Sequence, residues 1–247
     1  MVEERTWFTV AAHLVLIAGV AVVAFPLYVT LIASSHDLPT LLRGRVPLLP
    51  GDQGWANYAM VLTRGVPSGG APPVSVMLMN SLVMALGIAL GKIAMSIIAA
   101  YAIVYFRFPL RMTCFWLIFI TLMLPVEVRI LPTYKVVADL GLLDSYAGLI
   151  VPLVASATGT FLFRQFFLTV PPELAEAARM DGAGPLRFLW HVLLPLSRNS
   201  IAALFVIQFI YGWNQYLWPL VVTTKQSYYT VVLVISHAST FVCNPSA

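Results

Sequence analysis

Long apolar stretches constrain the fold of this chain more than any other feature of its sequence. The first runs from Val10 to Ala33. At about 1.5 Å of rise per helical residue, it exceeds the hydrocarbon core of a bilayer, which is about 30 Å thick. Apolar residues make up 60% of the chain, charged residues make up 10%, and the mean hydropathy is +0.89. These values are far from those of soluble domains, so we expect an all-α integral membrane protein.

Five stretches are long and apolar enough to be predicted as membrane spans. They are residues 10–33, 78–104, 113–131, 146–163 and 201–222. The remaining segments are predicted as a cytoplasmic N terminus at 1–9, an extracytoplasmic loop at 34–76, a cytoplasmic loop at 164–200 and an atypical tail at 223–247. The count of Lys and Arg, seven on one side and six on the other, favours this orientation once the three in the long first loop are discounted.

Two segments are expected to be irregular. The loop 34–76 is rich in Pro and Gly, which interrupt helices. Within the third predicted span, prolines at 125 and 132 bracket an acid and a base, so we expect the helix to break between Val126 and Pro132.

The longest polar interruption, residues 171–195, lies between the fourth and fifth predicted spans. It predicts two short helices joined by a tight turn, with Thr169 as the N-terminal cap and Gly182 ending the first helix in a left-handed conformation. The second helix is predicted to be amphipathic, with Leu186, Phe188, Leu189 and Val192 on its apolar face. A rigid hairpin of this kind suits a soluble partner. The alternative is an amphipathic linker that rests on lipid headgroups.

The spacing within this hairpin resembles the signature loop of ABC-importer permeases. The pattern is Glu-Ala-Ala, three residues, Gly, nine residues, an aliphatic residue, one residue and Leu-Pro. The matching residues are Glu176, Ala177, Ala178, Gly182, Val192, Leu194 and Pro195, with Val192 in place of the usual isoleucine. Further runs, at 106–111, 118–129, 143–148, 161–167 and 211–220, resemble the MalG-type permeases of carbohydrate ABC importers. Within that family, residues 7–232 are most similar to the glycerol-3-phosphate permease subunits of the UgpE type.

The resemblance implies a MetI-like transmembrane bundle in the bacterial inner membrane. It implies a different second permease subunit, two ATPase subunits and an extracytoplasmic substrate-binding protein as partners. ATP would bind the ATPase, and this non-catalytic chain would bind no cofactor, in keeping with its lack of a Gly-rich Walker A segment. The implied substrate is sn-glycerol-3-phosphate or a glycerophosphodiester, with another sugar or oligosaccharide as the alternative. The implied ATPase-coupling residues are Glu176, Ala177, Ala178, Asp181, Gly182, Leu194 and Pro195.

The tail departs from this family pattern. MalG-type permeases continue into a sixth span, whereas residues 228–235 are apolar but too few to cross a bilayer. A missing sixth span, through truncation or a frameshift, is therefore expected.

Five polar residues in or beside the predicted spans are candidates for a translocation path or gate, because polar groups are costly in lipid. They are Lys92, Glu127, Arg129, Asn214 and Gln215. Each has an alternative role. Lys92 could contact another subunit, Asn214 and Gln215 could form interhelical hydrogen bonds, and Arg129 could meet an anionic substrate. An ion pair with Glu127 is favoured for Arg129.

The remaining notable positions are predicted to be structural. Gly87 and Gly91 form a small-xxx-small step that allows another helix to approach closely. Trp218 is expected to anchor the chain at the membrane interface. His13 and His191 are expected to be packing or surface residues, because neither has partners at metal-ligand spacing.

Other classes of protein fit the sequence less well. An ion-coupled secondary transporter should show internal repeats and more intramembrane acids. A membrane-embedded enzyme would need a nucleophile–base pair or a metal cluster. The two cysteines offer no metal-ligand spacing, and no basic cluster suggests nucleic acid as a partner.

Overall fold

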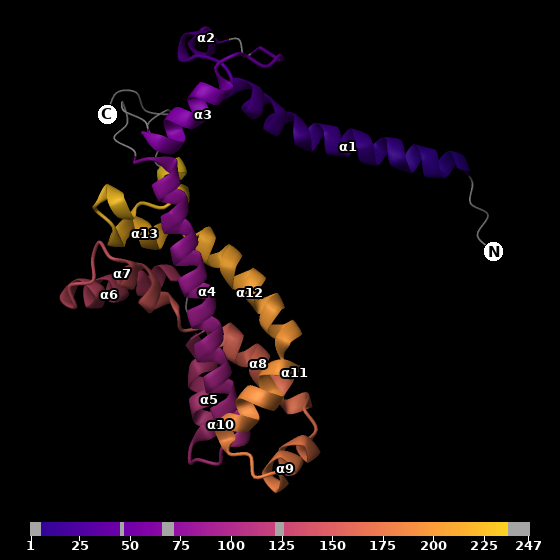
Figure 1. Ribbon diagram of the computed structural model, residues 1–247, viewed down its shortest axis with the longest axis vertical. Helices are drawn as coiled ribbons and strands as arrows, with labels where there is room; N and C mark the ends of the chain where they lie inside the picture. The colour runs from indigo at the N-terminus through magenta and orange to yellow at the C-terminus, as the bar shows by residue number, and fades with distance from the viewer. Residues whose placement is uncertain (1–5, 45–46, 66–71, 122–125, 237–247) are drawn as a thin grey trace. The chain divides into compact units, whose positions relative to one another are not determined.

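The computed structural model describes residues 6–44, 47–65, 72–121 and 126–236 (Figure 1). Every regular element in these ranges is a helix, which confirms the all-α prediction. The chain divides into two compact units, Met1–Pro73 and Val74–Ala247.

The first unit contains one long helix and two short ones. Helix α1 spans Thr6–Ala33, close to the predicted 10–33, and almost all of its side chains are exposed. The loop that follows is not irregular throughout, because it forms α2 (Leu38–Leu42) and α3 (Gly54–Thr63). The amide of Asn57 on α3 donates hydrogen bonds to the carbonyls of Ser34 and His36, 3.0 Å each. These bonds hold α3 against the end of α1.

The second unit is built around α4, Val74–Tyr105, which matches the predicted 78–104 (Figure 1). It packs along α8 (Ala157–Thr169) and α12 (Arg198–Trp213). Two buried clusters form along α4. One surrounds Ile93, Ile97 and Tyr101, and the other surrounds Met84 and Ile88. Because both clusters use α4, this helix is the central element of the unit.

Gly87 and Gly91 allow α4 to approach α7 (Tyr146–Ile150) and the 3-10 turn that follows it, Val151–Leu153. A Cβ added at Gly87 would lie 2.6 Å from Cδ1 of Ile150, and one added at Gly91 would lie 2.5 Å from Cγ1 of Val154. Real Cβ contacts are longer than this, so the prediction of close helix packing is confirmed.

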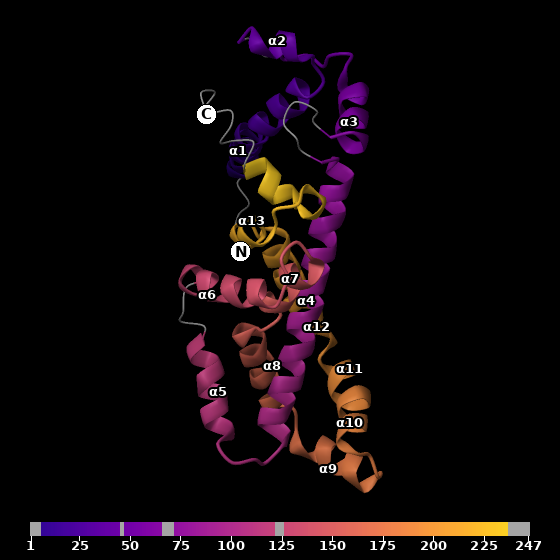
Figure 2. The same ribbon diagram turned by 90° about the vertical axis from the view of Figure 1, so that its left-hand side faces the viewer.

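The third predicted span, 113–131, falls on two separate helices, α5 (Arg111–Ile120) and α6 (Val126–Asp139), which runs beyond the predicted end (Figure 2). The prediction of irregular structure between Val126 and Pro132 is wrong, because α6 is helical throughout and includes Pro132. Ile130, Tyr134 and Val137 pack into the second cluster and hold the helix together despite the proline. Residues 122–125 lie outside the described part of the chain.

The fourth and fifth predicted spans are both broken. The segment Tyr146–Leu153 meets α8 at an angle of 47°. Helix α12 ends at Trp213, and α13 (Leu217–Val222) begins after a non-helical step. Apolar sequence on both sides of each break concealed it.

Among the described residues, two helices, at Trp7–Ala33 and Val74–Tyr105, are long and apolar enough to cross a membrane. Two bent pairs, one of them Pro185–Leu196 with Arg198–Trp213 at 74°, would raise that number to four if each forms one span. The count of five therefore stays a prediction. Residues 231–236 are helical, and the tail 237–247, part of the segment for which a missing span was predicted, lies outside the described residues.

Candidate functional site

The polar interruption forms a helical hairpin at one end of the second unit (Figure 2). Helix α9 spans Pro172–Met180, and α10 spans Pro185–Phe188. Gly182 between them has a φ of +72°, and the N–H of Ala183 donates to the carbonyl of Ala178 at 2.8 Å. The predicted glycine turn is therefore confirmed, since only glycine adopts this conformation without strain.

The prediction for the start of the hairpin is wrong. Pro171 occupies the N-cap position of α9, and the hydroxyl of Thr169 donates back to the carbonyl of Phe166 at 2.7 Å. A proline suits the start of a helix because the first N–H groups there have no partner within the helix.

The second half of the hairpin is fixed to α4 by apolar packing. Phe188, Leu189 and Leu193 are buried in the first cluster together with Tyr101 of α4. The hydroxyl of Tyr101 also donates to the carbonyl of Pro185 at 2.8 Å. Residues Leu189–Leu193 form a π-helical turn, and α11 (Leu194–Leu196) follows. The hairpin is thus a rigid extension of α4 and its neighbours.

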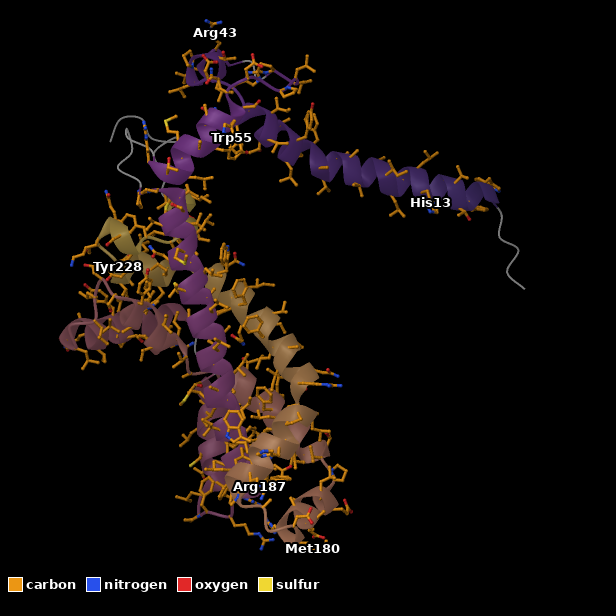
Figure 3. All side chains as sticks on the ribbon, viewed as in Figure 1. His13, Arg43, Trp55, Met180, Arg187 and Tyr228 are labelled. Carbon is orange, nitrogen blue, oxygen red and sulfur yellow. The ribbon has the colours of Figure 1, made fainter. Side chains whose placement is uncertain are left out.

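The other face of the hairpin is exposed and carries most of the predicted coupling residues. Glu176, Ala177, Asp181, Gly182 and Pro195 are exposed, whereas Ala178 and Leu194 are half-buried against the first cluster. Two large apolar side chains join this face: Met180, labelled in Figure 3, is 84% exposed, and Leu186 is 71% exposed. Leu186 therefore does not face inward as predicted. Acidic groups beside exposed apolar side chains suit a protein-docking surface.

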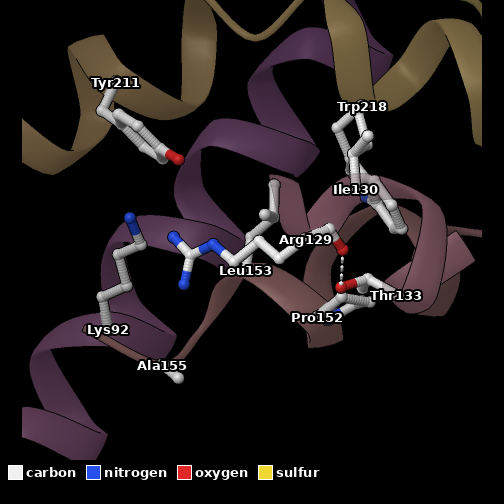
Figure 4. Close-up of a pocket in the computed structure, with 9 residues that line it drawn as sticks. All are labelled: Lys92, Arg129, Ile130, Thr133, Pro152, Leu153, Ala155, Tyr211 and Trp218. Atoms are coloured by element: carbon white, nitrogen blue, oxygen red, sulfur yellow. Dashed lines mark hydrogen bonds between the residues drawn. The ribbon is translucent and has the colours of Figure 1, made fainter. Parts of the chain in front are cut away.

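A second candidate site lies at the middle of α4. Nine residues line a hollow of about 110 Å³ (Figure 4). They are Lys92, Arg129, Ile130, Thr133, Pro152, Leu153, Ala155, Tyr211 and Trp218. Lys92 is 7% exposed, and its Nζ lies 3.6 Å from the centroid of the Tyr211 ring. Figure 4 shows the ammonium of Lys92 and the guanidinium of Arg129 pointing toward one another.

The favoured ion pair between Glu127 and Arg129 receives no support from the backbone. Both residues lie on α6, and residues two positions apart on a helix do not face each other. The side chain of Glu127 lies outside the described part of the chain. No carboxylate is among the described residues that line the hollow.

The other predicted path residues lie elsewhere. Asn214 is exposed and ends α12, and the amide of Gln215 donates to the carbonyl of Tyr211 within the same turn at 3.2 Å.

Trp218 is 3% exposed and donates from Nε1 to the carbonyl of Gly148 at 3.1 Å. It is a core residue, so its prediction as an interface anchor is wrong. Sequence reasoning missed Tyr211, whose signal was its place in the matched run 211–220.

The family comparison decides what kind of protein carries these two sites. A family model described as "Binding-protein-dependent transport system inner membrane component" matches residues 92–241. The chain belongs to this family. The match includes both the hairpin and the charged hollow. As a member of this permease family, the chain is a non-catalytic, multi-pass component of the inner membrane. It works with another permease, an ATPase and a substrate-binding protein.

Individual relatives of this permease are closely similar over most of their length. The sn-glycerol-3-phosphate transport system permease protein UgpE of Agrobacterium fabrum is 59% identical over 94% of this chain and 83% of its own. The proteins of the same name from Rhizobium meliloti and Yersinia pestis are 57% and 56% identical over 94% of this chain, and 83% and 82% of their own.

A solved structure shows the same permease fold. It is a bacterial ABC transporter involved in the import of the acidic polysaccharide alginate. Its matched chain has a TM-score of 0.79 at 24% identity, with 98% of this chain and 83% of that chain covered. At this identity the likeness shows the fold alone.

Proposed function

We propose that this chain is a transmembrane permease subunit of an ATP-driven importer for sn-glycerol-3-phosphate or glycerophosphodiesters. The observation that carries the proposal is the identity of 56–59% to relatives named as permeases for sn-glycerol-3-phosphate. Identity of this degree over 94% of the chain supports a shared class of substrate.

The proposed assembly contains this chain and one different permease as a heterodimer, with two ATPase subunits and an extracytoplasmic binding protein. ATP binds the ATPase subunits, and this chain holds no cofactor. The N terminus and the hairpin are cytoplasmic, and the loop 34–76 is extracytoplasmic. The count of basic residues supports this orientation.

Coupling in this assembly depends on contacts that differ between two states. The exposed face of the hairpin, with Glu176, Ala177, Asp181 and Gly182, binds a groove of the ATPase. ATP-driven closure of the ATPase moves the hairpin. Phe188 and Leu193 pass that movement to α4, because they share a buried cluster with it.

The substrate is tested by uptake into proteoliposomes that contain the complete complex and ATP. We expect uptake of glycerol-3-phosphate in a panel that also contains glycerophosphodiesters, neutral sugars and oligosaccharides. Uptake of a neutral sugar alone would replace the proposed substrate. Uptake driven by an ion gradient without ATP would instead favour a secondary transporter.

A further inference from the structure

We propose that Lys92 and Arg129, together with Tyr211, form a binding site for a phosphomonoester in the translocation path. The inference rests on the proposed function and deepens it, because it says where this chain holds the phosphate of its substrate. The site is the hollow between α4, α6 and α12.

The first argument is the environment of Lys92. Its side chain is 93% buried in the middle of a long apolar helix, and its described partner is the face of the Tyr211 ring. A cation–π contact offsets part of the cost of burying an ammonium, but a buried charge normally also has an anion beside it. In the part of the chain that the structure describes, no carboxylate pairs with Lys92. An anionic ligand can supply that anion.

The second argument is the convergence of two like charges. Arg129 comes from a different helix, yet its guanidinium points toward the ammonium of Lys92 (Figure 4). Two cations that share one hollow repel each other unless an anion lies between them. The backbone of Arg129 is held in place, since its carbonyl accepts a hydrogen bond from Thr133 Oγ1 at 2.7 Å. None of the described hydrogen bonds uses its guanidinium, so this group is available to a ligand.

The third argument is the match to phosphate chemistry. The ammonium offers three donors, and the guanidinium offers a planar fork that binds two phosphate oxygens at once. A phosphomonoester carries about 1.5 to 2 negative charges at pH 7, which two cations neutralise. The hollow, about 110 Å³, holds several water molecules and so has room for a phosphate group. Pro152, Leu153 and Ala155 form an apolar wall.

The test uses the complete complex in proteoliposomes with glycerol-3-phosphate as the transported probe. Lys92→Gln and Arg129→Gln should each lower the maximal uptake rate about tenfold or more, the size expected for losing a charged hydrogen bond. Arg129→Lys should transport faster than Arg129→Gln but slower than wild type, because the charge remains while the planar fork is lost. The matched control is Lys135→Gln, an exposed cation on the same helix outside the hollow, which should transport as wild type does.

The outcomes separate this site from the proposed function. If wild type carries glycerol-3-phosphate and both Gln variants carry it equally fast, the site is overturned while the function stands. If Arg129→Lys is slower than Arg129→Gln, a cation at this position does not aid transport, and the site is again overturned. If wild type carries no phosphorylated polyol, the proposed function itself fails. If Lys92→Gln does not assemble into the complex, the uptake rate of Arg129→Gln alone tests the site, because Arg129 is exposed and its substitution does not disturb the core.

Discussion

Asp144 joins two connecting segments of the second unit. Its carboxylate accepts hydrogen bonds from the N–H and hydroxyl of Thr224, at 2.6 and 2.7 Å, and from the N–H of Lys225 at 2.8 Å. Burial raises the pKa of Asp144, but the hydrogen bonds and the charge of Lys225 outweigh it, so the pKa lies below its ordinary value. The residue also has a φ of +52°, a conformation that Asp and Asn tolerate better than most residues.

We expect Asp144→Asn to destabilise the protein by about 1 kcal/mol, because the neutral amide is a poorer acceptor but keeps the backbone conformation. A lowered folded pKa means that this stabilisation is fully present above the unfolded value of about 4 and is lost as the pH falls through the folded value. Thermal unfolding is measured from pH 3 to pH 7 on the purified wild-type and Asp144→Asn permeases. The difference between their melting temperatures should become smaller below about pH 4.

The control for this prediction is Asp139→Asn, an exposed carboxylate at the end of α6, which should unfold at the wild-type temperature. Equal melting temperatures for wild type and Asp144→Asn at pH 7 would contradict the role of Asp144. A difference in melting temperature between the two proteins that stayed the same down to pH 3 would also contradict it.

At this scale the sequence predicted which residues were unusual better than it predicted their partners. Lys92 and Arg129 stood out because charges are costly inside a span, but their convergence depends on how α4 and α6 pack. Glu127 was chosen as the partner of Arg129 because it is near in sequence, and helical geometry separates those positions. Asp144 lies in the matched run 143–148, but nothing in the sequence indicated its partners, which lie about 80 residues away in the chain.

At the scale of elements, Gly87 and Gly91 let α4 pack closely against the segment that contains Ile150 and Val154. We expect Gly91→Ala to destabilise the protein by about 1–3 kcal/mol, although alanine favours helices, because the new Cβ would overlap Val154. The second substitution Val154→Ala should restore most of the loss. Thermal or denaturant unfolding in detergent measures both.

The matched control is Gly19→Ala in α1, where an added Cβ would meet nothing within 4 Å. This variant should be neutral or slightly more stable than wild type. Gly91→Ala would speak against close packing if it behaved like the control.

The exposed face of the hairpin leads to a prediction about coupling. We expect Glu176→Ala to lower uptake per ATP hydrolysed several-fold in the reconstituted complex, because it alters the proposed ATPase contact without touching the buried cluster. Gly182→Ala should act in the same direction through the strain of a positive φ, about 1–2 kcal/mol, and Gly182→Asn should be milder. Uptake and phosphate release are measured on the same vesicles.

For comparison, Asp52→Ala removes an exposed acid in the first unit and should leave coupling unchanged. Wild-type coupling in both Glu176→Ala and Gly182→Ala would remove the hairpin from the mechanism.

The long elements could be predicted from the sequence, and the breaks between shorter ones could not. Helices α1 and α4 follow from long apolar runs, and the turn of the hairpin follows from Gly182. The break after Trp213 has apolar residues on both sides and is set by burial of Trp218 in the core. In α6, packing overcame the local effect of Pro132.

At the scale of the whole molecule, the proposed orientation can be checked with cysteine labelling. In a background with Cys114→Ser and Cys243→Ser, Trp55→Cys should react with a membrane-impermeant maleimide in spheroplasts. Met180→Cys should react only after the membrane is opened. Both side chains are suitable because they are 87% and 84% exposed. The permease pair is labelled without its ATPase, so that Met180 stays uncovered. The reverse pattern would invert the orientation.

Helix α4 contributes a residue to each candidate site, and these two residues are only a few helical turns apart. Tyr101 lies in the cluster that holds the hairpin, and Lys92 lines the charged hollow. Nine residues of helix separate them, about 14 Å along the axis. A displacement of the hairpin that keeps this cluster packed also moves Tyr101. Because Tyr101 and Lys92 belong to one continuous helix, the ammonium of Lys92 moves with it. In the proposed mechanism, movement that the ATPase imposes on the hairpin would thus reach the proposed phosphate site through this one helix.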